Sequence, residues 1–206
     1  MKTTTILGYI AISVFAFITV ESVWADSVDD FANKYYPPLK ANENDGTGLR
    51  IVLHQFFDEV PAASQSEVLA RIMERASAAT PPDNALIESI LSVSEGFQDK
   101  KVEWNTHLEK LIYAQAKNPD PNVRGMVVHA LAKMRKDAAR EVVLSFLNDP
   151  DDGVRSRALD SIDQWPDAES IYQGYIQSHH SDADHSKSLQ YANDNLNVLH
   201  EKGHGQ

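Results

Sequence analysis

Two seven-residue stretches near the middle of the chain decide the predicted fold. Residues 118–124 read Asn-Pro-Asp-Pro-Asn-Val-Arg, and residues 149–155 read Asp-Pro-Asp-Asp-Gly-Val-Arg, at an offset of 31 positions. The first proline, the aspartate after it and the Val-Arg pair recur, and small or aliphatic residues follow both copies at matching positions. Self-similarity at a period of about 20–50 residues is typical of repeat proteins, in which each unit buries its apolar face against the next. The sequence therefore predicts a stack of similar units.

Hydrophobic spacing on both sides of these stretches predicts helices. Leu49 to Val60 carries apolar residues at the spacing of one helix face, and eight further segments show the same periodicity. Ser64 to Glu67 has the pattern of a capping box, and Asp83 and Asp137 are predicted N-caps. No stretch alternates cleanly enough to be a strand. The predicted helices cover residues 49–60, 64–76, 83–91, 104–112, 123–134, 137–147, 154–165, 166–176 and 189–199.

The spacing between alternate helices gives the size of one unit. Their first apolar positions, Leu49, Leu86, Val123 and Val154, follow each other at intervals of 37, 37 and 31 residues. An interval of this size holds one helix hairpin, which must stack on its neighbours to bury its apolar side. We therefore expect an all-α fold, a short right-handed α-solenoid of about four stacked helix hairpins with a closing helix.

The pattern Asp-Pro-Asp-x-x-Val-Arg, followed by small and aliphatic residues, resembles HEAT repeats. It is most similar to the short HEAT-like type also found in bilin-lyase-related proteins. The resemblance covers about residues 118–165, whereas the segments 48–116 and after 166 share only the helical periodicity. It implies that the two arginines hydrogen-bond an aspartate of the neighbouring unit and form a structural ladder between repeats. The ladder positions are Asp120, Arg124, Asp151 and Arg155.

The aspartates in these stretches also have a local interpretation. Asp120 or Asn122 in the first copy, and Asp151 or Asp152 in the second, stand where a side-chain oxygen can cap the next helix. Such an oxygen accepts an otherwise unpaired N–H and complements the positive end of the helix.

The N-terminal 25 residues have the three parts of a secretory signal peptide. Lys2 gives a positive start, residues 6–20 are apolar apart from a serine and a threonine, and Val23-Trp24-Ala25 offers a signal-peptidase site. An uncleaved membrane anchor is the alternative, but an apolar run of 15 residues is short against the roughly 20 that cross a bilayer. We expect cleavage after Ala25 and export to a bacterial periplasm or to the medium.

The composition narrows the class of partner. Lys and Arg number 19 against 30 Asp and Glu, for a formal net charge of −11. This balance disfavours nucleic acids and anionic lipid surfaces, and it favours a protein partner with a basic patch. The chain has no cysteine, which excludes disulfides, thiolate metal sites and cysteine nucleophiles.

Histidines near the C-terminus are the candidate metal ligands. His179, His180 and His185, with Asp182 and Asp184, offer nitrogen and oxygen ligands suited to zinc, copper or nickel. Their spacing matches no closed tetrahedral motif, and the segment falls where a turn between repeats is expected. The alternatives are therefore a weak metal site and a polar turn.

The sequence contains no recognisable catalytic pattern, such as a Gly-x-Ser-x-Gly elbow, a phosphate-binding glycine loop or a His-Glu-x-x-His pair. We therefore expect a non-enzymatic protein without a cofactor, acting as an exported protein-interaction adaptor or scaffold, with periplasmic metal binding as the alternative function. The predicted divisions are a signal peptide over 1–25, an N-terminal segment and linker over 26–45, the solenoid over 46–200 and a flexible tail over 201–206. Within the N-terminal segment, residues 26–36 are expected to form a short helix that either caps the first hairpin or stays mobile.

Overall fold

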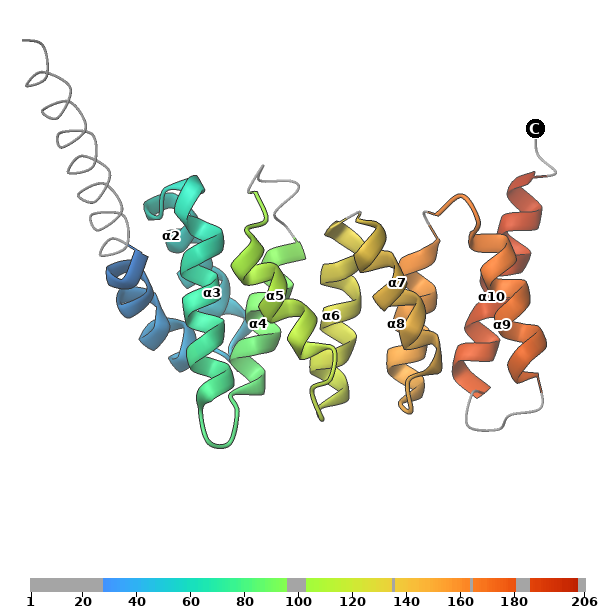
Figure 1. The fold of residues 1–206 in the computed structure, drawn as a ribbon, viewed down its shortest axis with the longest axis horizontal. Coiled ribbons are helices and arrows are strands. Elements are labelled where there is room, and N and C mark those ends of the chain that lie inside the picture. The colour runs from blue at the N-terminus through green and yellow to red at the C-terminus, as the bar shows by residue number, and fades with distance from the viewer. Residues whose placement is uncertain (1–27, 96–102, 135, 164, 181–185, 204–206) are drawn as a thin grey trace, which may run out of the picture.

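The computed structural model describes residues 28–95, 103–134, 136–163, 165–180 and 186–203, and every regular element in them is a helix (Figure 1). The prediction of an all-α fold is confirmed. A first helix occupies residues 28–41. It is followed by α2 (Gly46–Glu59), α3 (Ala62–Ala78), α4 (Asn84–Glu95), α5 (Thr106–Gln115), α6 (Pro121–Met134), α7 (Asp137–Ser145, extended by a 3₁₀ turn at Phe146–Asn148), α8 (Asp152–Ile162), α9 (Ala168–His179) and α10 (Ser186–Gly203).

The helices from α3 onward pair as hairpins that stack side by side. The pairs are α3 with α4, α5 with α6, α7 with α8, and α9 with α10, and the turns of the first three pairs lie along the lower edge in Figure 1. The even-numbered helices pack closely on one another from α4 to α10, whereas α5 and α7, and α7 and α9, are further apart. The predicted solenoid of four stacked hairpins is confirmed, with a tight row of even helices and a row of odd helices that is looser from α5 onward.

The division into hairpins begins one helix later than the spacing of Leu49, Leu86, Val123 and Val154 suggested. That spacing pairs α2 with α3, α4 with α5, α6 with α7, and α8 with α9. Of these pairs only α6 and α7 pack closely in the described residues. The physical reason is that a repeat period is the same whichever helix opens the unit. The Asp-Pro turns at residues 118–120 and 149–151 are short and close a hairpin, so they lie within units and not between them.

One continuous core runs through the stack. Each helix contributes its predicted apolar stripe, and the largest buried aliphatic side chains come from both rows. Fully burying a leucine or isoleucine stabilises a fold by roughly 1.5–3 kcal/mol, so these stripes supply the main driving force for stacking. The fully buried aliphatic side chains include Leu69, Ile72, Leu86, Ile87, Leu91, Ile112, Val127, Leu159 and Ile162.

The N-terminal helix covers one end of the stack. Tyr35 packs edge-on against Phe56 of α2, with ring centroids 5.3 Å apart, and its hydroxyl donates to the Gln55 carbonyl at 3.1 Å. Ala32, Tyr35 and Leu39 are buried. The helix continues through Pro37 and Pro38 to residue 41, beyond the predicted end at residue 36. Of the two alternatives for this segment, the structure shows the docked cap.

Two predicted helix starts are wrong. Helix α3 begins at Ala62, and the Ser64 N–H donates to the Pro61 carbonyl, so Ser64 and Glu67 form no capping box. Pro61 is the N-cap, and its carbonyl accepts from the Ser64 N–H, so Ser64 lies inside the first turn. At α7 the N-cap is Lys136, and Asp137 lies in the first turn. The Asp83 cap is confirmed, since its carboxylate accepts from the Leu86 N–H at 3.3 Å.

Among the described residues, no helix has both the length and the apolar character needed to cross a membrane. The predicted signal peptide lies outside the described residues.

Candidate functional site

The ladder residues lie at the hairpin turns, and Arg124 makes the central link. Its Nε and Nη2 donate to the two carboxylate oxygens of Asp149, both at 2.8 Å, while Nη1 donates to the carbonyls of Asn118 at 2.9 Å and Pro119 at 3.0 Å. Both partners are largely buried, with side-chain exposures of 12% for Arg124 and 5% for Asp149. One guanidinium therefore fixes its own turn and holds the turn of the next hairpin.

Electrostatics agree with this geometry. Burial alone would raise the pKa of Asp149, but the hydrogen bonds from Arg124 and the backbone outweigh it, and the net pKa lies below its usual range. The hydrogen bonds to Asp149 raise the pKa of Arg124. The pair is thus ionised and charge-assisted at neutral pH.

Arg155 repeats the same backbone contacts at the next turn. Its Nη1 donates to the carbonyls of Asp149 at 2.6 Å and Pro150 at 3.0 Å, the counterparts of the Arg124 contacts 31 residues earlier. The link to the next hairpin differs, because Arg155 Nε donates to the Ser188 hydroxyl of α10 at 3.5 Å, while its Nη2 binds Asp152 of its own helix at 2.8 Å. Asp152 in turn accepts from the Ser188 hydroxyl at 2.6 Å and from the Lys187 N–H at 3.1 Å at the start of α10.

On the other side of the central link, the connection is made by amides and a carboxylate. Asn84 at the start of α4 donates to Asp120 at 3.2 Å and accepts from Asn118 at 3.2 Å. Asp120 also accepts from the Asn122 N–H within its turn, and Asp151 caps α8 by accepting from the Val154 N–H at 3.0 Å.

The structure thus places the four predicted ladder residues in one line along the hairpin turns, but Asp120 and Asp151 are not the partners of the arginines. The sequence reasoning missed Asn84, Asp149 and Ser188 as partners. For Asp149 a signal existed, since it precedes the repeated proline at the position that Asn118 occupies in the first copy. Asn84 and Ser188 lie outside the repeated pattern, so only the packing of α4 and α10 reveals them.

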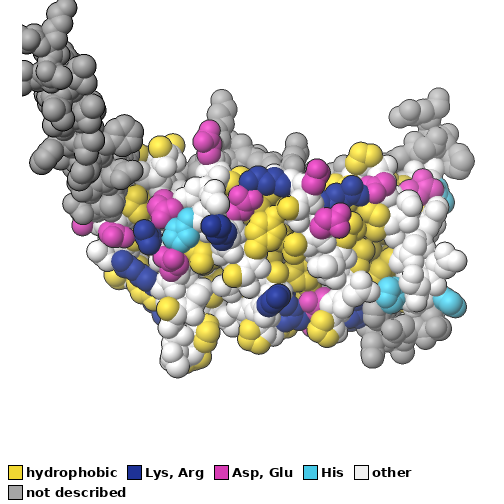
Figure 2. Space-filling model, in the orientation of Figure 1, with side chains coloured by type: hydrophobic (Ala, Val, Ile, Leu, Met, Phe, Trp, Pro, Cys, Tyr) yellow, Lys and Arg dark blue, Asp and Glu magenta, His cyan; other side chains and the backbone are white. Residues whose placement is uncertain are grey.

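A second set of links joins the odd-numbered helices nearer the opposite edge. Figure 2 shows charged side chains of both signs along the upper edge of the face on which α3, α5 and α7 lie in front. His107 of α5 bonds Glu67 and Glu74 of α3 through its two ring nitrogens, each at 2.8 Å. Lys136 at the start of α7 donates to Glu109 of α5 at 2.7 and 2.8 Å.

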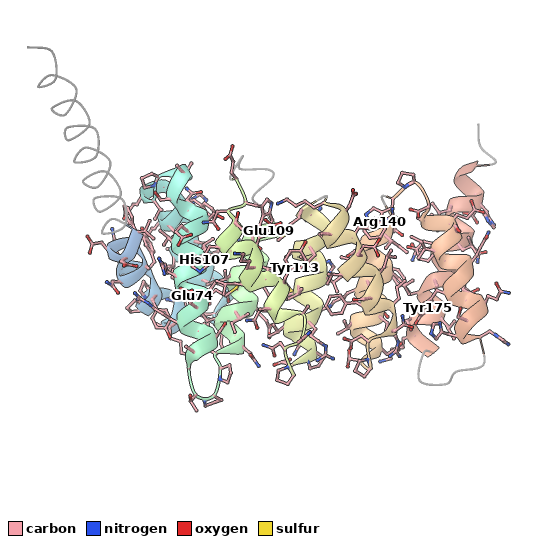
Figure 3. The ribbon with its side chains drawn as sticks, in the orientation of Figure 1. Glu74, His107, Glu109, Tyr113, Arg140 and Tyr175 are labelled. Atoms are coloured by element: carbon pink, nitrogen blue, oxygen red, sulfur yellow. The ribbon has the colours of Figure 1, made fainter. Side chains whose placement is uncertain are left out.

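The last of these links is made by Arg140 of α7, whose Nη2 donates to Asp167 at the start of α9. The Arg140 guanidinium also lies 4.9 Å from the centre of the Trp165 ring, within reach of a cation–π interaction. Figure 3 shows His107 and Glu74 together on α5 and α3, and Arg140 near the upper end of α7.

A hollow of about 500 Å³ lies at this upper edge between α6, α7 and α8. We call it the α6–α8 hollow. Its charged and aromatic lining consists of Lys133, Lys136, Asp137, Arg140, Asp160 and Trp165. His129 also lines it, and burial together with the nearby Arg157 lowers the pKa of this imidazole, so His129 is neutral at pH 7.

The even-numbered row presents a continuous polar face. Arg157 of α8 lies over the backbone of Gly125 in α6, where a Cβ would meet the guanidinium at 2.4 Å. Its charge acts on His129 of α6 and on Glu88 of α4. Asp160 of α8 accepts from the hydroxyl of Tyr191 on α10. We call this surface, from Glu88 through His129, Arg157 and Asp160 to Tyr191, the even-row face.

The candidate metal ligands are only partly described. His179 Nδ1 contacts the Tyr175 carbonyl and His180 Nδ1 the Gln177 carbonyl, each at 3.0 Å, so both imidazoles bond to their own helix. Asp182, Asp184 and His185 lie outside the described residues. Among the residues that are described, no cluster of three or more histidine, aspartate or glutamate side chains has an arrangement that could hold a metal ion.

Comparison with known proteins identifies the repeats. Residues 96–172 match the family model described as HEAT repeats, whereas no curated protein and no solved structure matches the chain. The matched segment contains both copies of the Asp-Pro-Asp-x-x-Val-Arg pattern and the Arg124–Asp149 link. Its hairpins stack in register with those on either side. Residues 96–172 therefore contain HEAT repeats.

Proposed function

We propose that this protein is an exported, non-catalytic scaffold that binds another protein along the even-row face. HEAT repeats commonly serve as protein-interaction scaffolds, which makes a protein partner the first expectation. The observation that carries the proposal is the row formed by α4, α6, α8 and α10, which pack on one another across all four hairpins. Arg157 of α8 lies over Gly125 of α6, and Asp160 of α8 accepts from Tyr191 of α10. A surface of this extent suits a folded partner or a long segment better than a small molecule.

The net charge of −11 supports a partner with a basic patch. Long-range attraction of this kind raises the rate of encounter more than it tightens the complex. Association with such a partner is therefore expected to slow as salt is added, with a smaller change in dissociation.

Site-specific photocross-linking in the native host tests the proposed face. A photoreactive amino acid at Glu88 or Asp160 is expected to capture one defined partner, because both positions lie on the even-row face. Lys110 and Arg71, which are exposed on α5 and α3, provide matched controls on the odd row. The same adduct from the control positions, or none from the even-row positions, would contradict the proposal.

Export rests on the N-terminal sequence alone. If the signal peptide is cleaved after Ala25, the protein isolated from its host begins at Asp26. N-terminal sequencing decides this, and retention of Met1 would show that the segment is not removed.

The metal-binding alternative receives no support from the contacts of His179 and His180. For Asp182, Asp184 and His185 it stays a prediction.

A further inference from the structure

The α6–α8 hollow differs in charge from the chain as a whole. Three cationic side chains, Lys133, Lys136 and Arg140, line it against two carboxylates. One of these, Asp160, already accepts the Tyr191 hydroxyl. Three cations therefore meet at this hollow, two of them paired with the carboxylates of Glu109 and Asp167 at its rim.

One hydrogen-bond donor of Arg140, its Nε–H, has no partner among the described residues. A guanidinium binds a carboxylate most strongly through a two-pronged contact, and Arg124 makes that contact with Asp149 through Nε and Nη2. Arg140 uses Nη2 on Asp167, while its Nε is buried and has no hydrogen-bond partner among the residues the structure describes, so a carboxylate reaches Nε only when the Arg140–Asp167 contact opens. Both Nε and Nη2 of Arg124 therefore bind a carboxylate, whereas only Nη2 of Arg140 does.

The existing partners of these cations can be exchanged at low cost. Arg140 and Asp167 have side-chain exposures of 40% and 47%, and Lys136 is 48% exposed beside Glu109. Exposed ion pairs of this kind stabilise the fold by roughly 0–1 kcal/mol. Little free energy is therefore lost when an incoming carboxylate displaces Asp167 or Glu109.

The aromatic wall adds affinity for a peptide. Trp165 lies beneath the Arg140 guanidinium, and Leu131 and Ala132 line the hollow close by. Tryptophan and arginine together are the residue types most often found at the centre of protein interfaces. A segment carrying carboxylates next to methylene groups, as in glutamate side chains, matches both the charged and the apolar parts of the lining.

We propose that the α6–α8 hollow binds a glutamate-rich segment of the protein partner, with one carboxylate held by Nε and Nη2 of Arg140 and a second near Lys133 and Lys136. This inference rests on the proposed scaffold function and names the chemistry of one contact. The net negative charge of the chain attracts the basic surface of the partner from a distance. The hollow then binds an acidic segment of the same partner by direct contact.

Calorimetry with defined peptides on the purified full chain tests the proposal. Acetyl-tetraglutamate amide is expected to bind one-to-one, and the tetraglutamine and tetralysine peptides to give no saturable heat. Arg140→Gln is expected to weaken tetraglutamate binding by about tenfold or more, because a charge-assisted two-pronged contact is lost. Arg140→Lys is expected to weaken it nearly as much, since lysine keeps the charge and loses the planar fork.

A second variant separates binding from damage to the fold. Asp167→Asn breaks the same native ion pair as Arg140→Gln but removes the competing carboxylate, so it is expected to tighten tetraglutamate binding several-fold. Arg50→Gln, an exposed arginine on α2, is the charge-matched control and is expected to change nothing. Circular dichroism checks that each variant keeps its helix content.

Three outcomes would overturn the proposal: equal binding of tetraglutamine, unchanged binding by Arg140→Gln, or weaker binding by Asp167→Asn. None of these outcomes would contradict the scaffold function, which the cross-linking experiment tests separately. Cross-linking from Glu88 with no effect of Arg140→Gln would show that the protein binds a partner without using the hollow.

Discussion

The hairpin turns at one edge of the stack and the odd-row links at the other join the same repeats in different ways. At the turns, Arg124 and Asp149 are buried, bidentate and anchored to backbone carbonyls. In the odd row, Lys136–Glu109, Arg140–Asp167 and the His107 contacts are partly or largely exposed. The buried Arg124–Asp149 link fixes one turn relative to the next. The exposed links join odd-numbered helices. A repeat protein can therefore keep its stack rigid at one edge and leave polar groups at the other edge open to exchange with a ligand.

The largest effect is expected when the buried link is broken. Arg124→Ala leaves the Asp149 carboxylate and two turn carbonyls without their partner, and it is expected to lower the free energy of unfolding by about 3 kcal/mol or more. Urea denaturation at pH 7 measures the loss. A double-mutant cycle with Asp149→Asn isolates the pair, and a coupling near zero would show that the turn tolerates separation of the two hairpins.

Arg155→Ala is expected to cost about 1–3 kcal/mol, because the side chain is only 1% exposed and binds the Asp149 and Pro150 carbonyls as well as Asp152. Its salt bridge lies within one helix, so less of the link between hairpins depends on charge. Lys187→Ala, at an exposed side chain on α10, is the control and is expected to change stability by less than about 0.5 kcal/mol. If Arg155→Ala and Lys187→Ala changed the free energy of unfolding equally, Arg155 would not be a structural link of the ladder.

The exposed link is expected to contribute little. Lys136→Ala should lower the free energy of unfolding by less than about 1 kcal/mol, and added salt should reduce even that difference because exposed pairs are screened. Denaturation at low and high salt compares it with Arg124→Ala, whose cost should persist at high salt. A Lys136 effect as large as that of Arg124 would erase the distinction between the two edges.

The smallest expected effect is the pH dependence at His107. Burial alone would lower its pKa, but hydrogen bonds and charge from Glu67 and Glu74 outweigh burial and raise the pKa above its ordinary value. The folded state then holds the proton more tightly than the unfolded state, so the stabilisation is complete below about pH 6.5 and declines as pH rises through the raised pKa. Denaturation between pH 5.5 and 8.5 should show this decline in the native chain and its loss in His107→Gln. If the stability advantage of the native chain over His107→Gln grew as the pH rose, the pKa of His107 would be lowered by folding and not raised.

Local chemistry made the helices and the repeat readable from the sequence. Apolar residues at helical spacing place the stripes of α2 to α10 on one face each, because a period of 3.6 residues is a property of the local backbone. The Asp-Pro turns and the recurring Val-Arg pair mark equivalent positions in two units for the same reason. The arginines of the ladder were predictable from the recurring Val-Arg pair and its resemblance to HEAT repeats, whereas their contacts with carbonyls five or six residues back along the chain were not predicted.

Only the tertiary structure decided which groups meet across helices. Arg124 binds Asp149, Asp152 binds the start of α10 and Asn84 binds Asp120, because core packing sets the distance between hairpins and so selects the partner. The pairing of α3 with α4, and the hollow between α6, α7 and α8, depend on the tight even row and the looser odd row. A repeat period carries no information about that difference in spacing, because equivalent helices recur at the same interval however closely they pack.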